Sequence, residues 1–500
     1  MAPEPLYNIH FMLLVLAALV SLRLVYVAID RLILHPLAKI PGPKLAALTH
    51  LYEFYHDAIR SGKFTFLIDD LHRTYGPVVR INPREVHIQD PKFFDQLYNT
   101  SMKLDKDWYY YRFVGTSDAS FGTASYSQHR QRRKAFTRFF SQSAILNLEK
   151  QVRQSVLQLC ARLEEYRETN NPVILGSAFR SLATDVVSQY ALPEGFNLLS
   201  ARDFGKDYHN VNRKLSGVAA YNRHFPFIIP TVMMLPTWLV KLTATPGMVQ
   251  MLDFQSHNQD QARKIVATGK QSDDSVLHGI FHSDLPQSDK TASRIFQEAV
   301  TLVGAGSETT GSALEHIFYH ILANPAVKAR LLADISNAAK QGDLTSYEVL
   351  KHIPYLDAVI KEGLRMGNEV SGRLPRYDPQ NPITCNGYTF PPGTVISMSI
   401  RDLHLDPDCH PEPLKFSPER WLDPSMYKQS EQFFAPFGKG TRSCVGRELA
   451  MLQVMMVTAN LLHRFDVELF QTTYDDVRMQ YDFFSPFHAD DSKGLQVTIT

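Results

Sequence analysis

The ten residues Phe437–Gly446 combine side chains with clear chemical potential. They read FGKGTRSCVG and precede a long helix-like run. Their glycines allow a tight turn or a close approach of the backbone to a flat group. Arg442 offers a cation for an acidic group, and Cys444 lies just before the helix, where backbone N–H groups favour a thiolate. Cys444 therefore has two readings, a metal-bound sulfur or a buried structural cysteine.

Glu362 and Arg365 lie three residues apart, on one face of a predicted helix. An exposed pair of this kind contributes little to stability. A buried pair must instead be fully hydrogen-bonded, because removing one partner would leave a charge uncompensated. The sequence alone leaves both alternatives open.

A second predicted helix carries the small residues Gly304–Gly306, followed by Glu308 and Thr309. The Thr309 hydroxyl can donate to the carbonyl of Ala305, four residues earlier, and bend the helix. The small side chains could leave space for oxygen above a metal, with Glu308 as a nearby acid. The alternative is an ordinary helix-packing seam.

Taken together, these segments resemble the cytochrome P450 haem-thiolate monooxygenases. Phe437–Gly446 fills every fixed position of the family signature F-x-x-G-x-R-x-C-x-G, and Glu362 with Arg365 matches its E-x-x-R pair. Pro418–Trp421, PERW, resembles the P-E-R-F element, with Trp in the last place. Ala305–Thr310 resembles the oxygen-binding motif of the long central helix.

The resemblance covers about residues 35–500 and is strongest to fungal microsomal members similar to trichodiene oxygenase. It implies haem b (iron protoporphyrin IX) as cofactor, with Cys444 as the axial ligand of the iron and Phe437 and Gly438 beside it. It implies that Glu308 and Thr309, with water, deliver the protons that split the O–O bond. It also implies partners for the two haem propionates: Arg442, Arg133, Arg376 and, less typically because the family more often has Trp there, His129.

The implied reaction inserts one oxygen atom of O2 into a hydrophobic substrate, by hydroxylation or epoxidation, in fungal biosynthesis of a terpenoid or polyketide secondary metabolite. The aromatic runs Trp108–Phe113 and Phe483–Phe487 lie where family members line the substrate pocket, although plain core packing is the alternative. Two other functions stay open. A haem-thiolate isomerase or dehydratase would not need the Glu308–Thr309 pair, and a non-catalytic membrane haem protein would not need the complete motif set.

Electrons are expected from a separate protein, because residues 445–500 leave no room for a fused flavin domain. The resemblance implies NADPH–cytochrome P450 reductase, with cytochrome b5 as a second candidate donor. A basic docking surface is predicted at Arg130, Arg132, Lys134 and Lys439; a solvated helix face is the alternative for residues 130–134. The formal net charge of +1 argues against a partner nucleic acid.

Residues 1–34 predict a membrane anchor. Ile9–Ile29 is apolar and about as long as the roughly 20 residues that cross a bilayer. No basic start or small-residue cleavage site marks a cleaved signal peptide, although that and a buried helix remain alternatives. Arg31, Lys39 and Lys44 follow the span, so the catalytic domain should face the cytosol. We expect a single-pass protein of the endoplasmic reticulum membrane, in contact with membrane lipid.

A proline-rich hinge at residues 35–44 should lead as a stiff, extended link into one domain, 45–500, of the mainly α class with small β-sheets, the cytochrome P450 fold. Only four cysteines occur, which fits a reducing compartment. The apolar stretch 225–242, broken by three prolines, is either core or a surface loop that dips into the membrane. Helices are predicted over 130–165, 291–323, 325–341, 346–366 and 445–463, and strands over 78–81, 85–88, 383–386, 388–390, 395–400 and 496–499.

Overall fold

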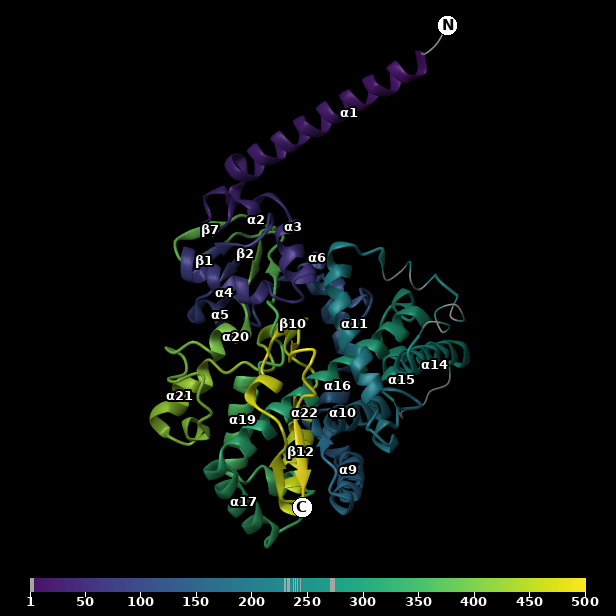
Figure 1. The fold of residues 1–500 in the computed structure, drawn as a ribbon, viewed down its shortest axis with the longest axis vertical. Coiled ribbons are helices and arrows are strands. Elements are labelled where there is room, and N and C mark those ends of the chain that lie inside the picture. Colours follow the sequence, from purple (N-terminus) through teal and green to yellow (C-terminus); the bar gives the residue numbers. More distant parts are fainter. Residues whose placement is uncertain are drawn as a thin grey trace.

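A computed structural model describes residues 4–228, 231, 234–236, 238, 240, 242, 244–269 and 275–500. The chain begins with a long helix, α1 (Glu4–Ile29), which continues into one π-helical turn, η1 (Asp30–Leu34). This helix projects from one end of the folded body, and the C-terminus lies at the other end (Figure 1).

Among the described residues, one helical segment is long and apolar enough to cross a membrane. It covers His10–Leu34, has a mean hydropathy of 2.5 and buries none of its residues against the body. A free apolar helix of this length is compatible with a membrane anchor. It extends five residues beyond the predicted end of the span at Ile29, because the η1 turn continues the helical chain.

The proline-rich segment after the anchor is more folded than the extended link that we expected. A 3-10 turn, η2 (Pro36–Lys39), buries Leu37 in the body. The backbone N–H of Arg80 donates to the Pro41 carbonyl at 2.8 Å. Gly42 allows this approach, because a Cβ there would lie 2.4 Å from the Arg80 carbonyl oxygen. The hinge is thereby attached to the first strand of the body.

Helices make up most of the body, which is built around α16 (Ala292–Ala323). The Thr291 side chain caps the start of α16, and the Asn324-Pro325 pair ends it. Four helices pack against it and enclose the main core: α10 (Leu175–Ala191), α14 (Pro246–Thr268), α19 (Pro354–Gly367) and α22 (Arg447–Arg464). The other α-helices used below are α3 (Leu51–Phe54), α4 (Phe64–Tyr75), α6 (Trp108–Tyr111), α7 (Tyr126–Thr137), α8 (Gln142–Asn147), α9 (Glu149–Thr169), α11 (Lys206–His224), α17 (Pro325–Ala339), α18 (Tyr347–Leu350) and α20 (Ile400–His404). Figure 1 also labels α2 (Lys44–Leu48), α5 (Pro91–Leu97), α15 (Val276–Phe281) and α21 (Pro424–Gln432).

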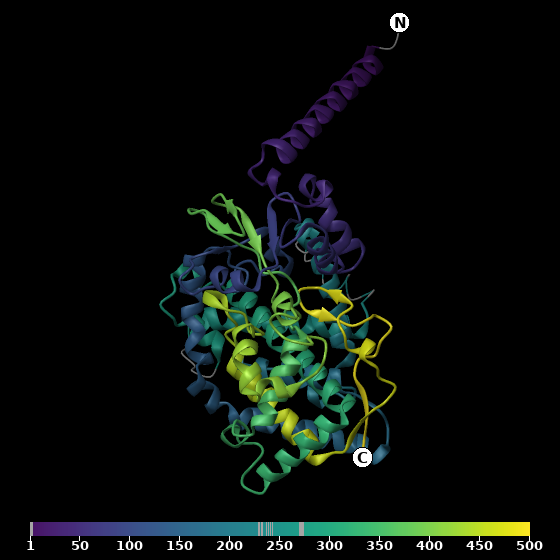
Figure 2. The same ribbon diagram turned by 90° about the vertical axis from the view of Figure 1, so that its left-hand side faces the viewer.

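The strands form small sheets, as predicted. The largest has the order β1-β2-β8-β5-β3, with β1 antiparallel to β2 and β2 parallel to β8. A second has the order β4-β12-β9, and two hairpins, β6–β7 and β10–β11, complete the set. Figure 2 shows β6–β7 in green near the anchor end of the body, while the yellow C-terminal segment follows another edge. The strands are β1 (Val78–Arg80), β2 (Glu85–Ile88), β3 (Asp105–Lys106), β4 (Val173–Ile174), β5 (Arg376–Tyr377), β6 (Ile383–Cys385), β7 (Tyr388–Phe390), β8 (Val395–Ser397), β9 (Val467–Leu469), β10 (Tyr481–Asp482), β11 (Pro486–Phe487) and β12 (Gln496–Ile499).

Three predicted elements differ from the structure, each for a local reason. The predicted helix 130–165 divides into α7, α8 and α9, because the Ser141 hydroxyl caps a new helix start. The predicted helix 346–366 divides into α18 and α19, since Pro354 can begin a helix but not continue one. The predicted strand 395–400 stops at Ser397, and Ile400 already begins α20.

The apolar stretch 225–242 lies partly outside the described residues. Phe225, Ile228 and Val240 are partly buried, but its other described large apolar side chains are exposed rather than part of a core: Phe227, Met234, Leu235, Trp238 and Leu242. At these positions the core alternative therefore does not hold.

Candidate active site

The Cys444 segment folds as a tight loop ahead of α22. The Cys444 N–H donates to the Phe437 carbonyl at 2.8 Å, closing the loop. Gly438 and Gly440 have φ angles of +67° and +73°, which other residues rarely adopt. A Cβ on Gly440 would also lie 2.4 Å from the Tyr98 carbonyl oxygen. Both glycines are therefore needed to bring Cys444 to the start of the helix.

The thiol of Cys444 is exposed, in contrast to the other three cysteines, which are buried. Protein nevertheless surrounds it, so it faces an internal space rather than the outer surface. Burial raises the pKa of the Cys444 thiol, against the opposing effects of the Gly446 backbone N–H and the Arg133 charge. The helix start alone does not make the thiolate that we expected. A bound metal cation would, because it deprotonates a coordinating thiol.

Cations gather beside this loop. Arg133 donates to the Ser443 carbonyl at 2.6 Å, and Arg442 donates to the carbonyls of residues 123 and 124, both at 2.7 Å. Arg376 donates to the Tyr111 hydroxyl at 2.7 Å. Burial and then the charge of Arg442 lower the pKa of His129 to about 2, so this ring is neutral. The structure thus brings together all four residues predicted for the propionates.

Lys106 is a fifth member of this group that sequence reasoning missed. Its ammonium is buried, donates to the Phe121 carbonyl at 2.7 Å and lies over the rings of Tyr111 and Phe121. Burial, followed by the charges of Arg376 and Arg442, lowers its pKa well below the usual value. No local motif marks Lys106, because the partners that define its role are distant in sequence.

The residues present fit an anionic group. In the part of the chain that the structure describes, none of Lys106, Arg133, Arg376 and Arg442 forms an ion pair with a carboxylate. The Nε of Arg442 is buried without a hydrogen-bond partner, and burial and the Arg376 charge lower the Arg442 pKa to about 9. Buried cations are normally paired. Lys106 and Arg376 are buried and Arg133 and Arg442 are half-buried, and the two propionates of a haem would offset part of this positive charge.

The middle of helix α16 is exposed although most of the helix is buried. We call this exposed place the gap in α16. Gly304 and Ala305 are exposed at the middle of the helix, and a Cβ on Gly304 would meet no atom within 4 Å. The Thr309 hydroxyl donates to the Ala305 carbonyl at 2.8 Å, as expected. Gly306 does not share this gap, because a Cβ there would lie 2.8 Å from the side chain of Val187 on α10. Gly306 serves helix packing instead.

Glu308 points toward α10 and forms an ion pair with Arg180 at 2.9 Å. Arg180 also binds Glu315 at 2.8 Å, about two turns further along the same face of α16. Burial opposes ionisation of Glu315, but the Arg180 charge outweighs it and holds the Glu315 pKa at about 2. Sequence reasoning missed Arg180 completely, since it lies more than a hundred residues before its partners.

The Glu362–Arg365 pair is fully buried and belongs to a network, so the exposed alternative is wrong. Arg365 donates to Glu362 twice at 2.9 Å, and Arg420 donates to the same carboxylate at 3.0 Å. The indole N–H of Trp421 adds a bond at 3.0 Å, which a Phe at this position could not make. These donors outweigh the effect of burial and hold the Glu362 pKa below its usual value.

Aromatic residues from the two predicted runs meet in one cluster. The Phe484 ring lies 5.3 Å from Phe113 and 5.6 Å from Phe121, between ring centroids. Tyr110 and Tyr111 complete the cluster, and Ala219 of α11 packs against it. Trp108 is excluded, since its side chain is 53% exposed. This apolar group lies next to the cations, because Phe121 and Tyr111 also contact Lys106.

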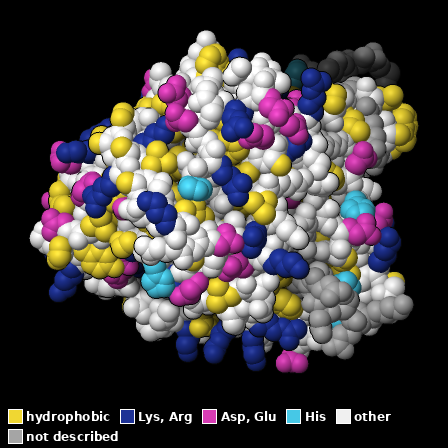
Figure 3. Space-filling model, turned by 90° about the horizontal axis from the view of Figure 1, so that it is seen from below, with side chains coloured by type: hydrophobic (Ala, Val, Ile, Leu, Met, Phe, Trp, Pro, Cys, Tyr) yellow, Lys and Arg dark blue, Asp and Glu magenta, His cyan; other side chains and the backbone are white. Residues whose placement is uncertain are grey.

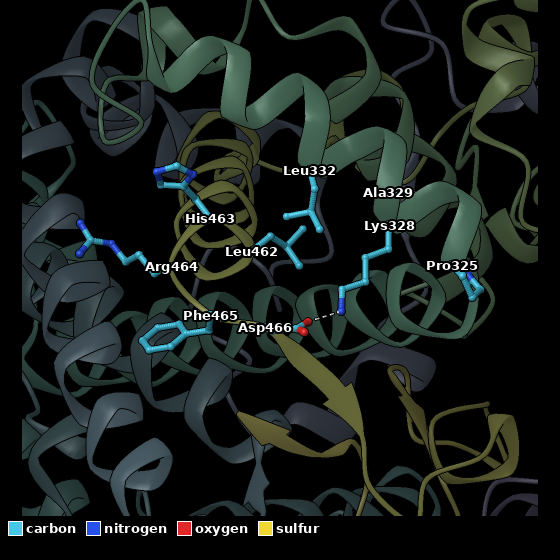
Figure 4. Close-up of a pocket in the computed structure, with 9 residues that line it drawn as sticks. All are labelled: Pro325, Lys328, Ala329, Leu332, Leu462, His463, Arg464, Phe465 and Asp466. Atoms are coloured by element: carbon cyan, nitrogen blue, oxygen red, sulfur yellow. Dashed lines mark hydrogen bonds and ion pairs between the residues drawn. The ribbon is translucent and has the colours of Figure 1, made fainter. Parts of the chain in front are cut away.

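A separate surface hollow of about 430 Å³ lies between α17 and the end of α22. Figure 4 shows Lys328 and Asp466 crossing it, with their charged atoms 2.7 Å apart. Cys444 lies before the opposite end of α22, an 18-residue helix about 27 Å long. The hollow is therefore remote from the candidate site.

Haem-thiolate enzymes combine an accessible thiol, a space beside a helix and cations that can bind two carboxylates. Comparison with known proteins gives the family of this chain. The model of the cytochrome P450 family matches residues 41–484. The chain belongs to this family: it is a haem-dependent monooxygenase that takes its electrons from a redox partner and acts on a hydrophobic substrate.

Similar proteins include fungal monooxygenases aligned over nearly their whole length. An N-acetyltryptophan 6-hydroxylase of Emericella nidulans is 35% identical, with 98% of this chain and 96% of the relative covered. A tryptophan 6-hydroxylase of Fusarium equiseti is 36% identical, with 94% of each covered. The retinoic acid-bound cyanobacterial CYP120A1 structure has a TM-score of 0.70 at 22% identity, over 92% of this chain and 99% of that one, and shows the fold.

Proposed function

We propose that Cys444 is the axial thiolate ligand of haem b, with Phe437 and Gly438 shaping the loop that presents it. The observation that carries this proposal is an accessible thiol beside buried and half-buried cations that pair with no carboxylate in the described part of the chain. When bound, haem supplies the redox chemistry that activates O2 and transfers one oxygen atom. The protein orients the substrate, excludes water and delivers protons.

The propionates would be held by Arg442, Arg133 and Arg376, with Lys106 as a further cation. His129 is neutral and can contribute one ring N–H. Each guanidinium can form charge-assisted hydrogen bonds with a carboxylate. The unpartnered Nε of Arg442 is the donor that such a ligand would satisfy.

Protons would reach the gap in α16 through Thr309 and Glu308. The Thr309 hydroxyl donates to the Ala305 carbonyl, which leaves its oxygen lone pairs free to accept a bond from water. Glu308 is paired with Arg180 as a carboxylate, so it must turn away from Arg180 and take up a proton from solvent before it can resupply one to that water. Arg180 thus sets how readily Glu308 takes part.

The substrate that we propose is a terpenoid or polyketide intermediate of fungal secondary metabolism, hydroxylated or epoxidised. The aromatic cluster around Phe484 supports an apolar ligand with few polar contacts. An indole-containing substrate is a second candidate, because two relatives are named as tryptophan or N-acetyltryptophan 6-hydroxylases. A flat aromatic ring could contact the partly exposed rings of Phe121 and Phe484.

We propose NADPH–cytochrome P450 reductase as the electron donor, with cytochrome b5 as an alternative. Two of the four residues predicted for the docking surface are already paired with carboxylates of the protein. Arg132 is buried and paired with Asp289, so it cannot contribute, and Lys439 is bound to Asp95. Arg130 and Lys134 of α7 are exposed, and Arg138 continues the same face at a spacing of four.

We propose residues 1–34 as a single-pass anchor in the endoplasmic reticulum membrane, 35–44 as the hinge and 45–500 as a cytosolic catalytic domain. The exposed helix and the basic residues that follow it support this orientation. Leu51, Tyr55 and Ile59 form an exposed apolar stripe near the anchor. On the face of the body opposite the anchor, basic and acidic side chains intermingle (Figure 3), which suits exposure to water.

The Cys444 assignment is tested by the carbon monoxide difference spectrum of the reduced protein. The wild type should show the red-shifted band of thiolate-ligated haem, and Cys444→Ser should lose it. Cys409→Ser, at a buried cysteine outside the loop, is the matched control and should keep the band. A red-shifted band that survives in Cys444→Ser would refute the assignment.

The substrate class is tested by titrating the purified protein with terpenes, polyketides, tryptophan and N-acetyltryptophan. A true substrate should shift the haem spectrum and accelerate NADPH-driven O2 consumption with formation of an oxygenated product. A spectral shift without O2 consumption would favour an isomerase or dehydratase. If the haem-loaded protein shows neither a spectral shift nor O2 consumption with any of these compounds, these substrate classes are excluded.

A further inference from the structure

His404 ends α20 and is completely buried between the end of α19 and the loop that leads to Cys444. Its ring stacks on Phe434, with centroids 5.7 Å apart and planes at 27°. No step of the proposed reaction uses this residue. Its contacts nevertheless connect two parts of the site.

The hydrogen bonds of His404 determine which ring nitrogen carries the proton. The backbone N–H of Ala435 lies 3.0 Å from Nε2 and can only donate, so Nε2 must accept. Nδ1 lies 3.0 Å from the Asn368 side-chain oxygen and therefore carries the proton and donates. The imidazole must be neutral to make both bonds, with its proton on Nδ1.

The backbone of His404 joins the same connection to the buried ion network. Arg365 donates to the His404 carbonyl at 2.7 Å while also binding Glu362. On the other side, the Ala435 carbonyl accepts from the N–H of Gly438 at 2.9 Å. The loop then closes through the bond from Cys444 to Phe437. A continuous series of hydrogen bonds thus runs from α19 to the Cys444 loop.

We propose that His404 is a positioning residue for the iron ligand: its neutral imidazole accepts from Ala435 and ties the Cys444 loop to the Glu362–Arg365 network. This inference rests on the proposed role of Cys444. Without the acceptor at Nε2, the buried Ala435 N–H would lose its partner, and the loop would gain freedom to move away from the iron.

The surroundings keep the ring neutral. Burial and the neighbouring His410, Arg365 and Lys439 all act to lower the pKa of His404 well below its usual value, and the backbone carbonyl of Arg365, as a hydrogen-bond acceptor, acts in the opposite direction. The facing group just after the end of α19, Asn368, is uncharged. A positive charge on this ring would therefore be unfavourable at any pH near neutral.

Two substitutions separate the two bonds of His404. His404→Gln places an amide oxygen where Nε2 lies and keeps an acceptor for Ala435, whereas His404→Asn keeps only a group near Nδ1 that can donate to Asn368. Both remove the imidazole and the stacking on Phe434, so they are matched for lost packing. The readout is the carbon monoxide difference spectrum of the haem-loaded, full-length protein.

We expect His404→Gln to retain the red-shifted carbonyl band and His404→Asn to increase the thiolate-free fraction about tenfold, as one lost buried hydrogen bond allows. A purely structural role would lower the melting temperature of both variants and change neither spectrum. Equal spectra for the two variants would overturn the proposal. Absence of the red-shifted band in the wild type would instead refute the role of Cys444.

A second variant covers the case in which His404→Asn does not fold. Asn368 has a φ of +50°, so Asn368→Gly keeps the backbone conformation while removing the partner of Nδ1. With the tautomer no longer fixed, the amide of Ala435 should exchange with deuterium about tenfold faster in the haem-loaded protein. Unchanged exchange at Ala435 would contradict the proposed connection.

Discussion

At the scale of single residues, the position of Glu308 is the feature that a local motif describes least well. Its neighbour Thr309 faces the gap in α16, whereas Glu308 is paired with Arg180 on another helix. Arg180 is shared with Glu315, so one guanidinium compensates two buried carboxylates. The proton donor of the proposed mechanism is thus held by a charge whose removal must affect stability as well as proton delivery.

Replacing Arg180 by Met should destabilise the protein by about 3–5 kcal/mol, because the buried Glu315 and the largely buried Glu308 would lose the one cation that pairs with them among the described residues. The measurement is urea-induced unfolding of the haem-loaded protein. Arg167→Met is the control, since Arg167 forms an exposed pair with Glu164 that should contribute less than about 1 kcal/mol. Equal effects of the two substitutions would contradict this account.

The candidate site could be predicted from sequence where its residues are contiguous. The Cys444 loop, Thr309 and the Glu362 network are encoded in short segments, and the structure places them as those segments suggest. Lys106 and Arg180 could not be predicted, because each is defined by partners more than a hundred residues away or by a loop that folds over it. The raised pKa of the Cys444 thiol could not be predicted either, because the local sequence does not show that the thiol is surrounded by protein.

At the scale of elements, α7 contributes to two different sites. One of its faces buries His129 and Arg132 and directs Arg133 toward the Cys444 loop. Its other face exposes Arg130 and Lys134 at a spacing of four, with Arg138 just beyond its end. An acidic redox protein bound to this stripe would contact the same helix that directs Arg133 toward the Cys444 loop.

Lys134→Glu should slow association with the reductase at low salt by roughly 3- to 10-fold and weaken the dependence of the rate on ionic strength. Reduction is followed by stopped-flow absorbance, with increasing reductase concentration. Lys264→Glu, at an exposed lysine of α14, has the same charge change away from the stripe and should have no effect. Equal slowing in both variants would mean that overall charge, not this stripe, determines docking.

Elements were predictable when a periodic pattern and a stop signal coincided, as for α16 and α17, which meet at Asn324-Pro325. Helix ends without a strong breaker residue could not be predicted. The hydroxyl of Ser141, for example, caps a new helix start inside a predicted helix. The parallel pairing of β2 with β8 joins residues three hundred positions apart. Such pairing depends on the assembled fold and leaves no local signal.

At the scale of the whole molecule, buried titratable groups govern how stability depends on pH. Burial lowers the pKa of several histidines outside the propionate group, most strongly those of His87, His209, His224, His320, His404 and His410. Below about pH 6.5 the unfolded chain protonates them while the folded chain does not, so acid favours unfolding. Burial raises the pKa of Asp57 and Asp185 to about 6 and of Asp402 to about 7, which acts in the opposite direction.

The histidines outnumber the aspartates, so the free energy of unfolding should fall on the order of 3 kcal/mol per pH unit between pH 6 and pH 5. Urea unfolding at several pH values measures this slope. His320→Phe is the informative variant, because its ring is stacked on Phe416 and its Nε2 has no partner. It should reduce the slope by about 1.4 kcal/mol per pH unit. An unchanged slope would show that His320 titrates normally in the folded protein.

The four cations without carboxylate partners also affect biosynthesis. Until the porphyrin arrives, like charges crowd one another inside the nascent fold, and its completion is opposed by their mutual repulsion. A ligand that binds only the folded chain shifts that balance by mass action. Cells short of porphyrin should therefore accumulate a loosened, protease-sensitive polypeptide, so that the amount of active enzyme follows the supply of its prosthetic group rather than the rate of translation alone.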